Sequence, residues 1–328
     1  ARVKGGVGFV WNGAGMLSFY KTDENGNLHT VDQVCRGCWV SAVAPDEKEQ
    51  EFLQREMGIV PEFVKASLDA EETSYVDRNE ENDQILVIVD YPEQDSQSNR
   101  RMTSYITLPI GVILLEGCIV TIANQPNSTV NALESGRIKD LDTRYKTRFL
   151  LQVLLLISQE FLTYLRQIEK LSTQTEQRLY KSMKNRELIH MLELDKSLVY
   201  FSTSLKGDEL TLNKIMRFKD IPLYEEDEEL LEDVMIEIKQ AIEMSEIYSN
   251  INSRTSEGFS NVINNNMNII MKRLTVITIV MSIPNMVYGF YGMNVTGLPV
   301  PFAWFPMVIS VVLSILCWFY FEKNDHYD

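Results

Sequence analysis

Two long apolar runs near the C-terminus constrain this chain more than any other feature. The first extends from Leu274 to Tyr291 and the second from Phe302 to Phe321, and neither contains a charged residue. Each run is about 20 residues long, which as an α-helix is enough to cross the hydrocarbon core of a bilayer. The connection between them, Thr296 to Pro301, is also uncharged. The sequence therefore predicts a hairpin of two membrane helices at the end of a longer soluble chain.

The basic residues that flank these runs predict the orientation of the hairpin. Lys272 and Arg273 precede the first run and Lys323 follows the second, whereas the connection has no basic residue. Because Lys and Arg concentrate on the cytoplasmic side of a membrane, both termini are expected in the cytoplasm. Residues 1–15 lack an apolar signal-peptide core, and we expect this Gly-rich start to be a vector remnant or a disordered segment.

The net charge of the chain limits the classes of partner that it is expected to bind. The 328 residues carry a formal net charge of −15. This excess of acidic groups argues against binding to nucleic acid or to anionic lipid headgroups and favours cations as partners. Four cysteines, with Cys317 inside the second run, are too few for a disulfide framework and fit a reducing cytoplasm.

Motifs for soluble metal or catalytic chemistry are weak. Cys35-Arg36-Gly37-Cys38 has the spacing of a zinc or redox pair, but it lacks a second pair, so two reduced cysteines beside a strand is the preferred interpretation. The three histidines, at 29, 190 and 326, are too scattered for a metal site. No phosphate-binding glycine loop, nucleophile elbow or organic-cofactor motif is present, so an enzyme is the least supported class.

The segment from Met16 to about Ala123 has the pattern of an α/β domain. A helix is expected from Pro45 onward, because acidic residues follow in its first turn. Short β-type runs separated by turn residues predict the strands. These runs are Leu17 to Tyr20, Trp39 to Val43, Ile85 to Val89, Ser104 to Leu108, Val112 to Leu115 and Cys118 to Ala123.

Beyond Leu141 the apolar spacing becomes helical. Tyr145 to Leu192 repeats apolar residues at intervals of three and four, and Gly207-Asp208 and Pro222 are expected to interrupt the helices that follow. A last helix is expected to begin in the acidic run Glu225 to Glu229 and to continue through Asn264 to Asn268 into the first apolar run. The sequence thus predicts long antiparallel helices that lead into a membrane span.

One face of this last helix collects small and polar residues. Steps of alternately four and three residues back from Gly289 reach Asn285, Ser282, Thr278, Thr275, Met271, Asn268 and Asn264. We call these eight residues, Gly289 included, the polar seam. This 3.5-residue spacing is typical of helices that wind around one another. A polar stripe facing lipid is unfavourable, so the seam is expected to face protein or water. For Thr275, Thr278 and Ser282, close helix packing explains the pattern as well as a pore does.

Gly292-Met293-Asn294 ends the first run shortly before the second begins. Together with Ile283-Pro284-Asn285 and Phe290-Tyr291, this motif resembles the CorA family of divalent-cation channels, and Glu187 to Phe201 resembles a soluble helix of that family. One departure is that the connection lacks the acidic residue that family members often carry. The resemblance implies a homopentameric funnel with an N-terminal α/β domain, a helical stalk and two transmembrane helices. It also implies a bacterial inner-membrane location.

The resemblance also implies roles for individual residues. Gly292, Met293 and Asn294 would form the selectivity filter, in which the Asn294 amides bind hydrated Mg²⁺; Gly292 would permit the helix to end there and Met293 would pack beneath. Met271 and Leu274 would form an apolar gate. The seam residues other than Met271 would line the pore, namely Gly289, Asn285, Ser282, Thr278, Thr275, Asn268 and Asn264. Aromatic residues at the ends of the second span would form membrane-interface belts. These aromatics are Trp304, Trp318, Phe319, Tyr320 and Phe321.

Regulation is expected in the acidic soluble part. By resemblance, Asp233 and, less closely, Asp69 match carboxylates that bind regulatory Mg²⁺ between neighbouring subunits. A solvated helix start is the preferred interpretation of Glu225 to Glu229. The function expected is passive Mg²⁺ uptake driven by the membrane potential, with Co²⁺ or Ni²⁺ as further ions. A zinc-transporting relative and a membrane-anchored scaffold or sensor remain as alternatives.

These expectations divide the chain into six segments. Residues 1–15 form the start described above. The soluble part consists of an α/β domain (16–140) and a helical bundle and stalk (141–271). The membrane part consists of the pore helix with its Gly-Met-Asn motif (272–294), an outer loop (295–301) and the second span with its tail (302–328).

Overall fold

The computed structural model describes residues 17–95, 103–138, 141–182, 185–217, 221, 224–293, 302 and 304–325. Contacts divide the chain into two compact units, Ala1–Ser256 and Glu257–Asp328. The strands are β1 (Leu17–Thr22), β2 (Leu28–Thr30), β3 (Cys38–Val43), β4 (Tyr75–Asn79), β5 (Gln84–Gln94), β6 (Tyr105–Leu114) and β7 (Cys118–Ala123). The helices are α1 (Glu47–Arg55), α2 (Pro61–Leu68), α3 (Ser128–Glu134), α4 (Lys146–Ser182), α5 (Asn185–Ile215), α6 (Glu225–Tyr291) and α7 (Phe305–Asp325).

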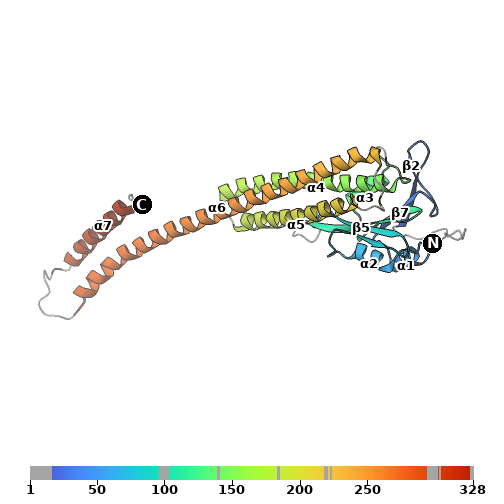
Figure 1. The fold of residues 1–328 in the computed structure, drawn as a ribbon. Coiled ribbons are helices and arrows are strands. Elements are labelled where there is room, and N and C mark those ends of the chain that lie inside the picture. The colour runs from blue at the N-terminus through green and yellow to red at the C-terminus, as the bar shows by residue number, and fades with distance from the viewer. Residues whose placement is uncertain are drawn as a thin grey trace. The chain divides into compact units, whose positions relative to one another are not determined.

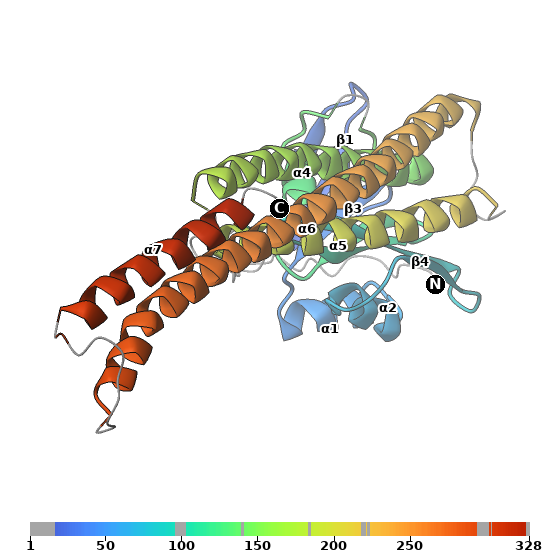
Figure 2. The same ribbon diagram turned by 90° about the vertical axis from the view of Figure 1, so that its left-hand side faces the viewer.

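The first unit is built on a seven-stranded sheet with the order β2-β1-β3-β7-β6-β5-β4. All neighbouring strands are antiparallel except β3 and β7, which are parallel. Helices α1 and α2 cover one face of the sheet, and α3, α4, α5 and the start of α6 cover the other (Figures 1 and 2). Because both faces are covered, the central strands are buried throughout, as their continuous apolar runs require.

Two hydrophobic cores follow from this layering. The larger one joins the sheet to α4, α5 and α6 around Trp39, Phe149, Phe161 and Phe201, and the smaller one packs α1 and α2 onto the opposite face. The predicted segments 16–140 and 141–271 therefore contribute to the same large core. The predicted order of an α/β sheet followed by long helices is confirmed, whereas the six segment boundaries stay predictions.

Strand β6 corrects the expectation of two separate strands at Ser104 to Leu108 and Val112 to Leu115. It runs unbroken through Pro109 and Gly111. Pro109 pairs with Asp90 of β5, and β7 ends at Ala123 opposite Ile110, so no strand on the other side requires the N–H that proline lacks. A Cβ at Gly111 would collide with the Ser67 side chain, so this glycine lets α2 approach the sheet closely.

The expected interruption at Gly207-Asp208 is wrong, because both residues lie inside α5. A Cβ at Gly207 would lie 3.3 Å from Cβ of Ser74, so glycine permits close contact with the segment before β4. The other expected break, Pro222, lies outside the described residues. Strands β2 and β4 and helices α2 and α3 were not anticipated from the sequence, and the expected continuous helix beyond Glu225 is confirmed as α6.

Asp208 and Asp90 form a buried carboxyl pair where α5 meets the sheet. Asp208 Oδ1 accepts hydrogen bonds from Ser74 Oγ (2.7 Å) and from the Asp90 backbone N–H (3.0 Å), and Ser204 Oγ lies 2.5 Å from Asp90 Oδ2. Among the described residues neither carboxyl has an ion-pair partner. Burial raises the pKa of Asp208 well above its usual range, and the neighbouring Asp90 adds to the shift. Burial also raises the pKa of Asp90.

This pair predicts a pH dependence of stability. A carboxyl with a raised folded-state pKa holds its proton more tightly in the folded chain, so its contribution is greatest below the unfolded value near 4 and is lost as pH rises through the folded value. The loss is about 1.4 kcal/mol per pH unit for each extra proton. In Asp208→Asn one titrating group is gone, so the melting temperature should fall less between pH 4 and pH 8 than in the parent. Asp77→Asn, which changes an exposed aspartate of β4, is the control, and equal pH profiles for parent and Asp208→Asn would contradict the assignment.

Candidate ion pathway

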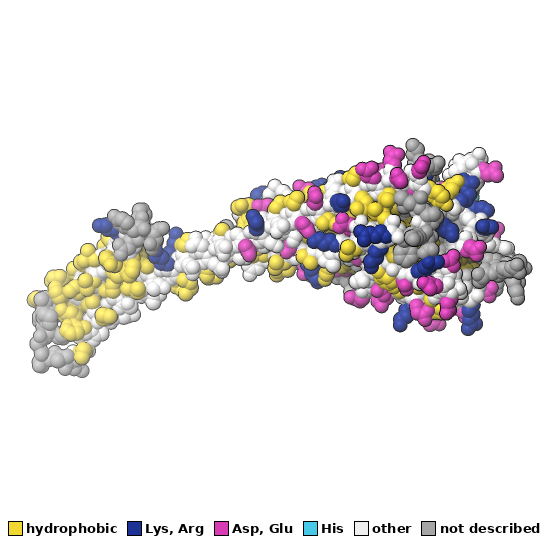
Figure 3. Space-filling view, viewed as in Figure 1, with side chains coloured by type: hydrophobic (Ala, Val, Ile, Leu, Met, Phe, Trp, Pro, Cys, Tyr) yellow, Lys and Arg dark blue, Asp and Glu magenta, His cyan; other side chains and the backbone are white. Residues whose placement is uncertain are grey.

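Three described helices are long and apolar enough to cross a membrane, by length and composition. They are Lys146–Lys181, Asp227–Tyr291 and Phe305–Lys323. The apolar window of the first is 61% buried inside the chain's own core, whereas those of the other two are 0% and 11% buried. Hydrophobic side chains accordingly gather over the C-terminal part of α6 and over α7, while charged side chains gather over the first unit (Figure 3). Of these three apolar windows, only those of the last two helices are left without a covering from the chain's own core.

Within the second unit, α6 and α7 meet at a proline. Pro284 lies inside α6 and has no N–H, so the carbonyl of Val280, four residues earlier, lacks its helical donor. Ser314 Oγ of α7 lies 3.5 Å from this carbonyl oxygen and donates to it. Further along α6 and α7, the ring centroids of Tyr291 and Phe305 are 6.2 Å apart. A side chain from the neighbouring helix therefore satisfies the polar group that the proline exposes, as helices in lipid require.

The side of α6 that faces α7 differs from the polar seam. Its apolar residues with intermediate exposure are Val276, Val280, Ile283, Val287 and Tyr291. All eight members of the polar seam are exposed in the single chain. Since successive helical residues are about 100° apart, the two sets centre on opposite sides of α6. The helix thus presents an apolar side to α7 and a polar side away from it.

The hydroxyl groups of the polar seam donate to their own helix. Thr275 Oγ1 donates to the Met271 carbonyl and Thr278 Oγ1 to the Leu274 carbonyl, each at 2.8 Å, and Ser282 Oγ donates to the Ile279 carbonyl at 2.7 Å. Each proton is used within the helix, so the oxygen lone pairs are left as acceptors on the exposed side. The three hydroxyls therefore form a row of acceptors, which suits cations and their waters.

The small and amide residues of the seam are not explained by packing against α7. A Cβ at Gly289 would meet no atom within 4 Å, so no neighbour in the chain demands glycine there. Asn285, Asn268 and Asn264 are exposed on the same side. Met271 and Leu274, the predicted apolar gate, have exposed fractions of 52% and 55%. These residues are available for contacts outside the single chain.

At the end of α6, Gly292 and Met293 are described but Asn294 and the outer loop lie outside the described residues. The Gly292 N–H donates to the Tyr288 carbonyl at 2.8 Å. Gly292 does not adopt the left-handed conformation that a glycine-requiring turn would need. A Cβ there would instead approach the Tyr288 carbonyl oxygen to 3.1 Å. Met293 is 57% exposed in the single chain.

The two carboxylates proposed for regulation lie in different layers of the first unit. Asp69 caps the C-terminal end of α2 and is exposed, with Oδ1 accepting from the Glu71 N–H at 3.1 Å. Asp233 is exposed on α6, which packs on the opposite face of the sheet from α2 (Figure 2). One chain therefore does not bring them together. Across the described part of the chain, no group of three or more His, Cys, Asp or Glu side chains could hold a metal ion.

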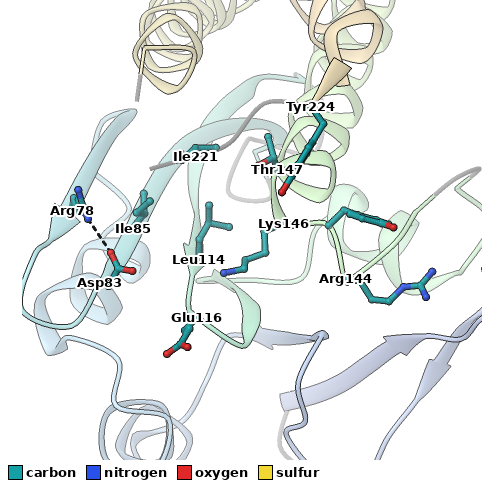
Figure 4. Close-up of a pocket in the computed structure, with 11 residues that line it drawn as sticks. Arg78, Asp83, Ile85, Leu114, Glu116, Arg144, Lys146, Thr147, Ile221 and Tyr224 are labelled. Atoms are coloured by element: carbon teal, nitrogen blue, oxygen red, sulfur yellow. Dashed lines mark hydrogen bonds and ion pairs between the residues drawn. The ribbon is translucent and has the colours of Figure 1, made fainter. Parts of the chain in front are cut away.

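A polar pocket of about 410 Å³ lies at the N-terminus of α4 (Figure 4). Its basic groups already have partners. Arg78 pairs with Asp83 at 3.0 Å, Arg144 pairs with Asp142 at 2.6 Å, and Lys146 Nζ donates to the Leu115 carbonyl at 2.5 Å. The basic side chains that line the pocket are thus already engaged, and the seam of α6 is the stronger candidate site.

Comparison with known families bears on this arrangement. Residues 36–323 match the family model described as CorA-like Mg²⁺ transporter protein. The chain belongs to this family. It is 26% identical over 302 residues to the cobalt/magnesium transport protein CorA of Methanocaldococcus jannaschii, covering 87% of this chain and 90% of that protein. The chain is therefore a divalent-cation transporter of the CorA family.

Solved structures share the fold. The complete structure of the CorA magnesium transporter from Methanocaldococcus jannaschii has a TM-score of 0.74 with 22% identity, covering 94% of this chain and 96% of that one. The full-length CmaX protein has a TM-score of 0.68 with 15% identity, covering 95% and 99%. At these identities the likeness concerns the arrangement of the elements. It extends over the sheet, the long helices and the C-terminal helix pair.

Ser314 was not anticipated from the sequence, although Pro284 inside an apolar run signals a carbonyl in need of a donor. We expect Ser314→Ala to lower the stability of the purified protein in detergent by about 1 kcal/mol, because the Val280 carbonyl would lose its donor in an apolar surrounding. Ser310→Ala is the matched control, since Ser310 Oγ donates to the Met307 carbonyl of its own helix. Equal melting temperatures for Ser314→Ala and the control would show that the contact between the helices does not stabilise the pair.

Proposed function

We propose that this chain forms a homopentameric channel that conducts Mg²⁺ passively into the cell, driven by the membrane potential. The observation that carries the proposal is the polar seam on the side of α6 opposite α7. One such seam cannot enclose a path, so several copies must gather with their seams inward. In that assembly α7 would form the outer layer, and its exposed Trp318, Phe319 and Tyr320 would suit a membrane interface.

The chemistry of the seam suits a hydrated divalent cation. Mg²⁺ gives up its waters reluctantly, so a pore that accepts hydrogen bonds from those waters lets the ion pass without dehydration. The hydroxyls of Thr275, Thr278 and Ser282 keep their lone pairs for this role, because their protons bond to the helix. Neutral amides of Asn285 add acceptors without the tight binding that a carboxylate would bring. Two charges moving through 100 mV gain about 4.6 kcal/mol, which is enough to drive uptake.

The same pentameric assembly would assign roles to the other predicted site residues. Asn294, with Gly292 and Met293, would form the selectivity filter at the outer end. Met271 and Leu274, exposed on α6, would meet their counterparts in other subunits and form an apolar gate that closes by dewetting. Asn264 and Asn268 would line the cytoplasmic approach. The basic residues Lys272, Arg273 and Lys323 support cytoplasmic termini in a bacterial inner membrane.

Regulation would act between subunits. Asp69 and Asp233 are both exposed but belong to opposite layers of one chain, so a shared site would need Asp69 from one subunit and Asp233 from its neighbour. Mg²⁺ between them would offset the repulsion of the carboxylates and hold the pore closed. A fall in internal Mg²⁺ would release the contact. Because Asp233 and the seam lie on the same helix, a displacement at one end has a continuous path to the other.

The seam should matter more than the residues beside it. Asn285→Leu replaces an acceptor by an apolar group, and a ring of such groups would raise the barrier for a hydrated ion, so Mg²⁺ flux into liposomes should fall about tenfold or more. Ile279→Leu, on the same helix but off the seam, should leave flux unchanged. Both variants should assemble as the parent does by size-exclusion chromatography. Equal flux from Asn285→Leu and the parent would mean that the seam does not line the path.

The regulatory role predicts a change in ligand sensitivity without loss of conduction. Asp233→Asn weakens a Mg²⁺ site with little change in volume, so the variant should conduct at internal Mg²⁺ that closes the parent and should lose Mg²⁺-dependent protection from protease. Glu229→Gln, another exposed acid of α6, is the control. Adding Asp69→Asn should have little further effect if both residues form one site. Closure of Asp233→Asn at the same internal Mg²⁺ as the parent would exclude Asp233 as a ligand.

A further inference from the structure

Cys35 and Cys38 are joined by a tight turn at the start of β3. The Cys38 N–H donates to the Cys35 carbonyl at 3.2 Å, and the Cys35 N–H donates to Cys38 Sγ at 3.3 Å. Gly37, between them, has φ +76°, the left-handed conformation that a type II turn requires at its third residue. The turn therefore holds the two cysteines close together on a backbone that requires glycine.

A third thiol completes the group. In the parallel register of β3 and β7, Cys38 lies directly opposite Cys118. Cys38 and Cys118 belong to the smaller hydrophobic core, and Cys35 packs against its edge. Cys38 is fully buried and Cys118 is nearly so, whereas Cys35 is partly exposed. A small molecule from solution can therefore reach Cys35, with Cys38 immediately behind it.

The surroundings favour a thiolate at Cys38. The hydrogen bond from Cys118 lowers the pKa of Cys38 to about 6 despite its burial, and the backbone of Cys35 contributes in the same direction. Burial and the neighbouring Cys38 raise the pKa of Cys35. Lys21 of β1 lies opposite Cys38 in register, and Arg36 is exposed in the turn itself. Cys35, which is accessible, can make the first attack on an anionic disulfide beside these basic residues, and Cys38, with its lowered pKa, can make the second attack.

We propose that Cys35 and Cys38 form a site of thiol–disulfide exchange for small anionic disulfides, with Cys118 positioning Cys38. The Cys35 thiolate attacks one sulfur of the disulfide RSSR, so a bond forms between Cys35 and RS and the second RS leaves as a thiolate. The Cys38 thiolate then attacks Cys35 Sγ and expels the first RS. The two cysteine protons end on the two released thiols. Cys35 and Cys38 are oxidised to a disulfide and RSSR is reduced to two RSH.

Two simpler interpretations fit less well. A metal site is not supported, because the described residues contain no group of three or more ligands placed to hold an ion. Packing alone accounts for the burial of Cys38 and Cys118, which belong to the smaller core, but not for the bond from the Cys35 N–H to Cys38 Sγ. The ring closed by a Cys35–Cys38 disulfide spans only four residues, so little stabilisation is expected. The test must therefore detect the disulfide itself and not a change in stability.

The experiment uses the full-length purified protein with Cys317→Ser, so that the cysteine of α7 contributes no signal. After incubation with oxidised glutathione at pH 7, intact mass and peptide mapping should show the loss of two hydrogen masses and a Cys35–Cys38 link that dithiothreitol reverses. Cys38→Ser should keep one glutathione on Cys35, because nothing displaces it. Cys35→Ser should remain unmodified, because Cys38 and Cys118 are buried.

Cys118→Ser separates a positioning role from a packing role. It should still close the disulfide, but Cys38 should displace glutathione from Cys35 several-fold more slowly at pH 7, and this displacement should become faster at higher pH, because less of Cys38 would be thiolate at pH 7. Melting temperatures of the reduced variants check that each one is folded. The proposal is overturned if the parent stays unmodified, if the link joins Cys38 to Cys118, or if Cys38→Ser releases its glutathione as fast as the parent does.

Discussion

A helix in hydrocarbon must satisfy every polar group without water, and α6 meets this constraint in a way that leaves one side polar. The protons of three hydroxyls bond to carbonyls of the same helix, and the carbonyl exposed by Pro284 accepts from Ser314 of α7. These three hydroxyls then need no further partner for their protons, while their oxygens stay available as acceptors. A row of available acceptors is costly beside lipid and useful beside water. This balance is the physical basis for placing the seam along an ion path.

The first unit provides the core on which the long helix α6 starts. The sheet and α4, α5 and the start of α6 share one large core, so α6 begins from a rigid base. The exposed acids of this unit give it the negative charge that suits cation sensing. Buried acids such as Asp208 and Asp90 have another effect, since they make the stability of the junction between α5 and the sheet depend on pH.

Features with a repeating pattern could be predicted from the sequence, and features made by long-range contact could not. The uncharged apolar runs predicted the two C-terminal helices, and the spacing of three and four residues predicted the seam on α6, because side chains on one face of a helix recur at that interval. Separate strands were expected before Pro109 and after Gly111, and a break at Gly207, yet all three residues lie within an element, where a distant neighbour removes the conflict or requires the missing side chain. Cys118 lies 80 residues beyond Cys38 in the chain, so only the register of β3 and β7 brings the third thiol to the Cys35–Cys38 pair. Ser314 likewise meets Val280 only when α7 packs on α6.

The central claim is that this chain alone conducts Mg²⁺ down its electrochemical gradient. The most direct measurement is Mg²⁺ uptake into liposomes that contain only the purified protein, with the membrane potential set by a potassium gradient and valinomycin. We expect uptake that needs no nucleotide, increases with an inside-negative potential and stops when the potential is collapsed at equal Mg²⁺ on both sides. Uptake that is absent, or that is indifferent to the potential, would contradict it.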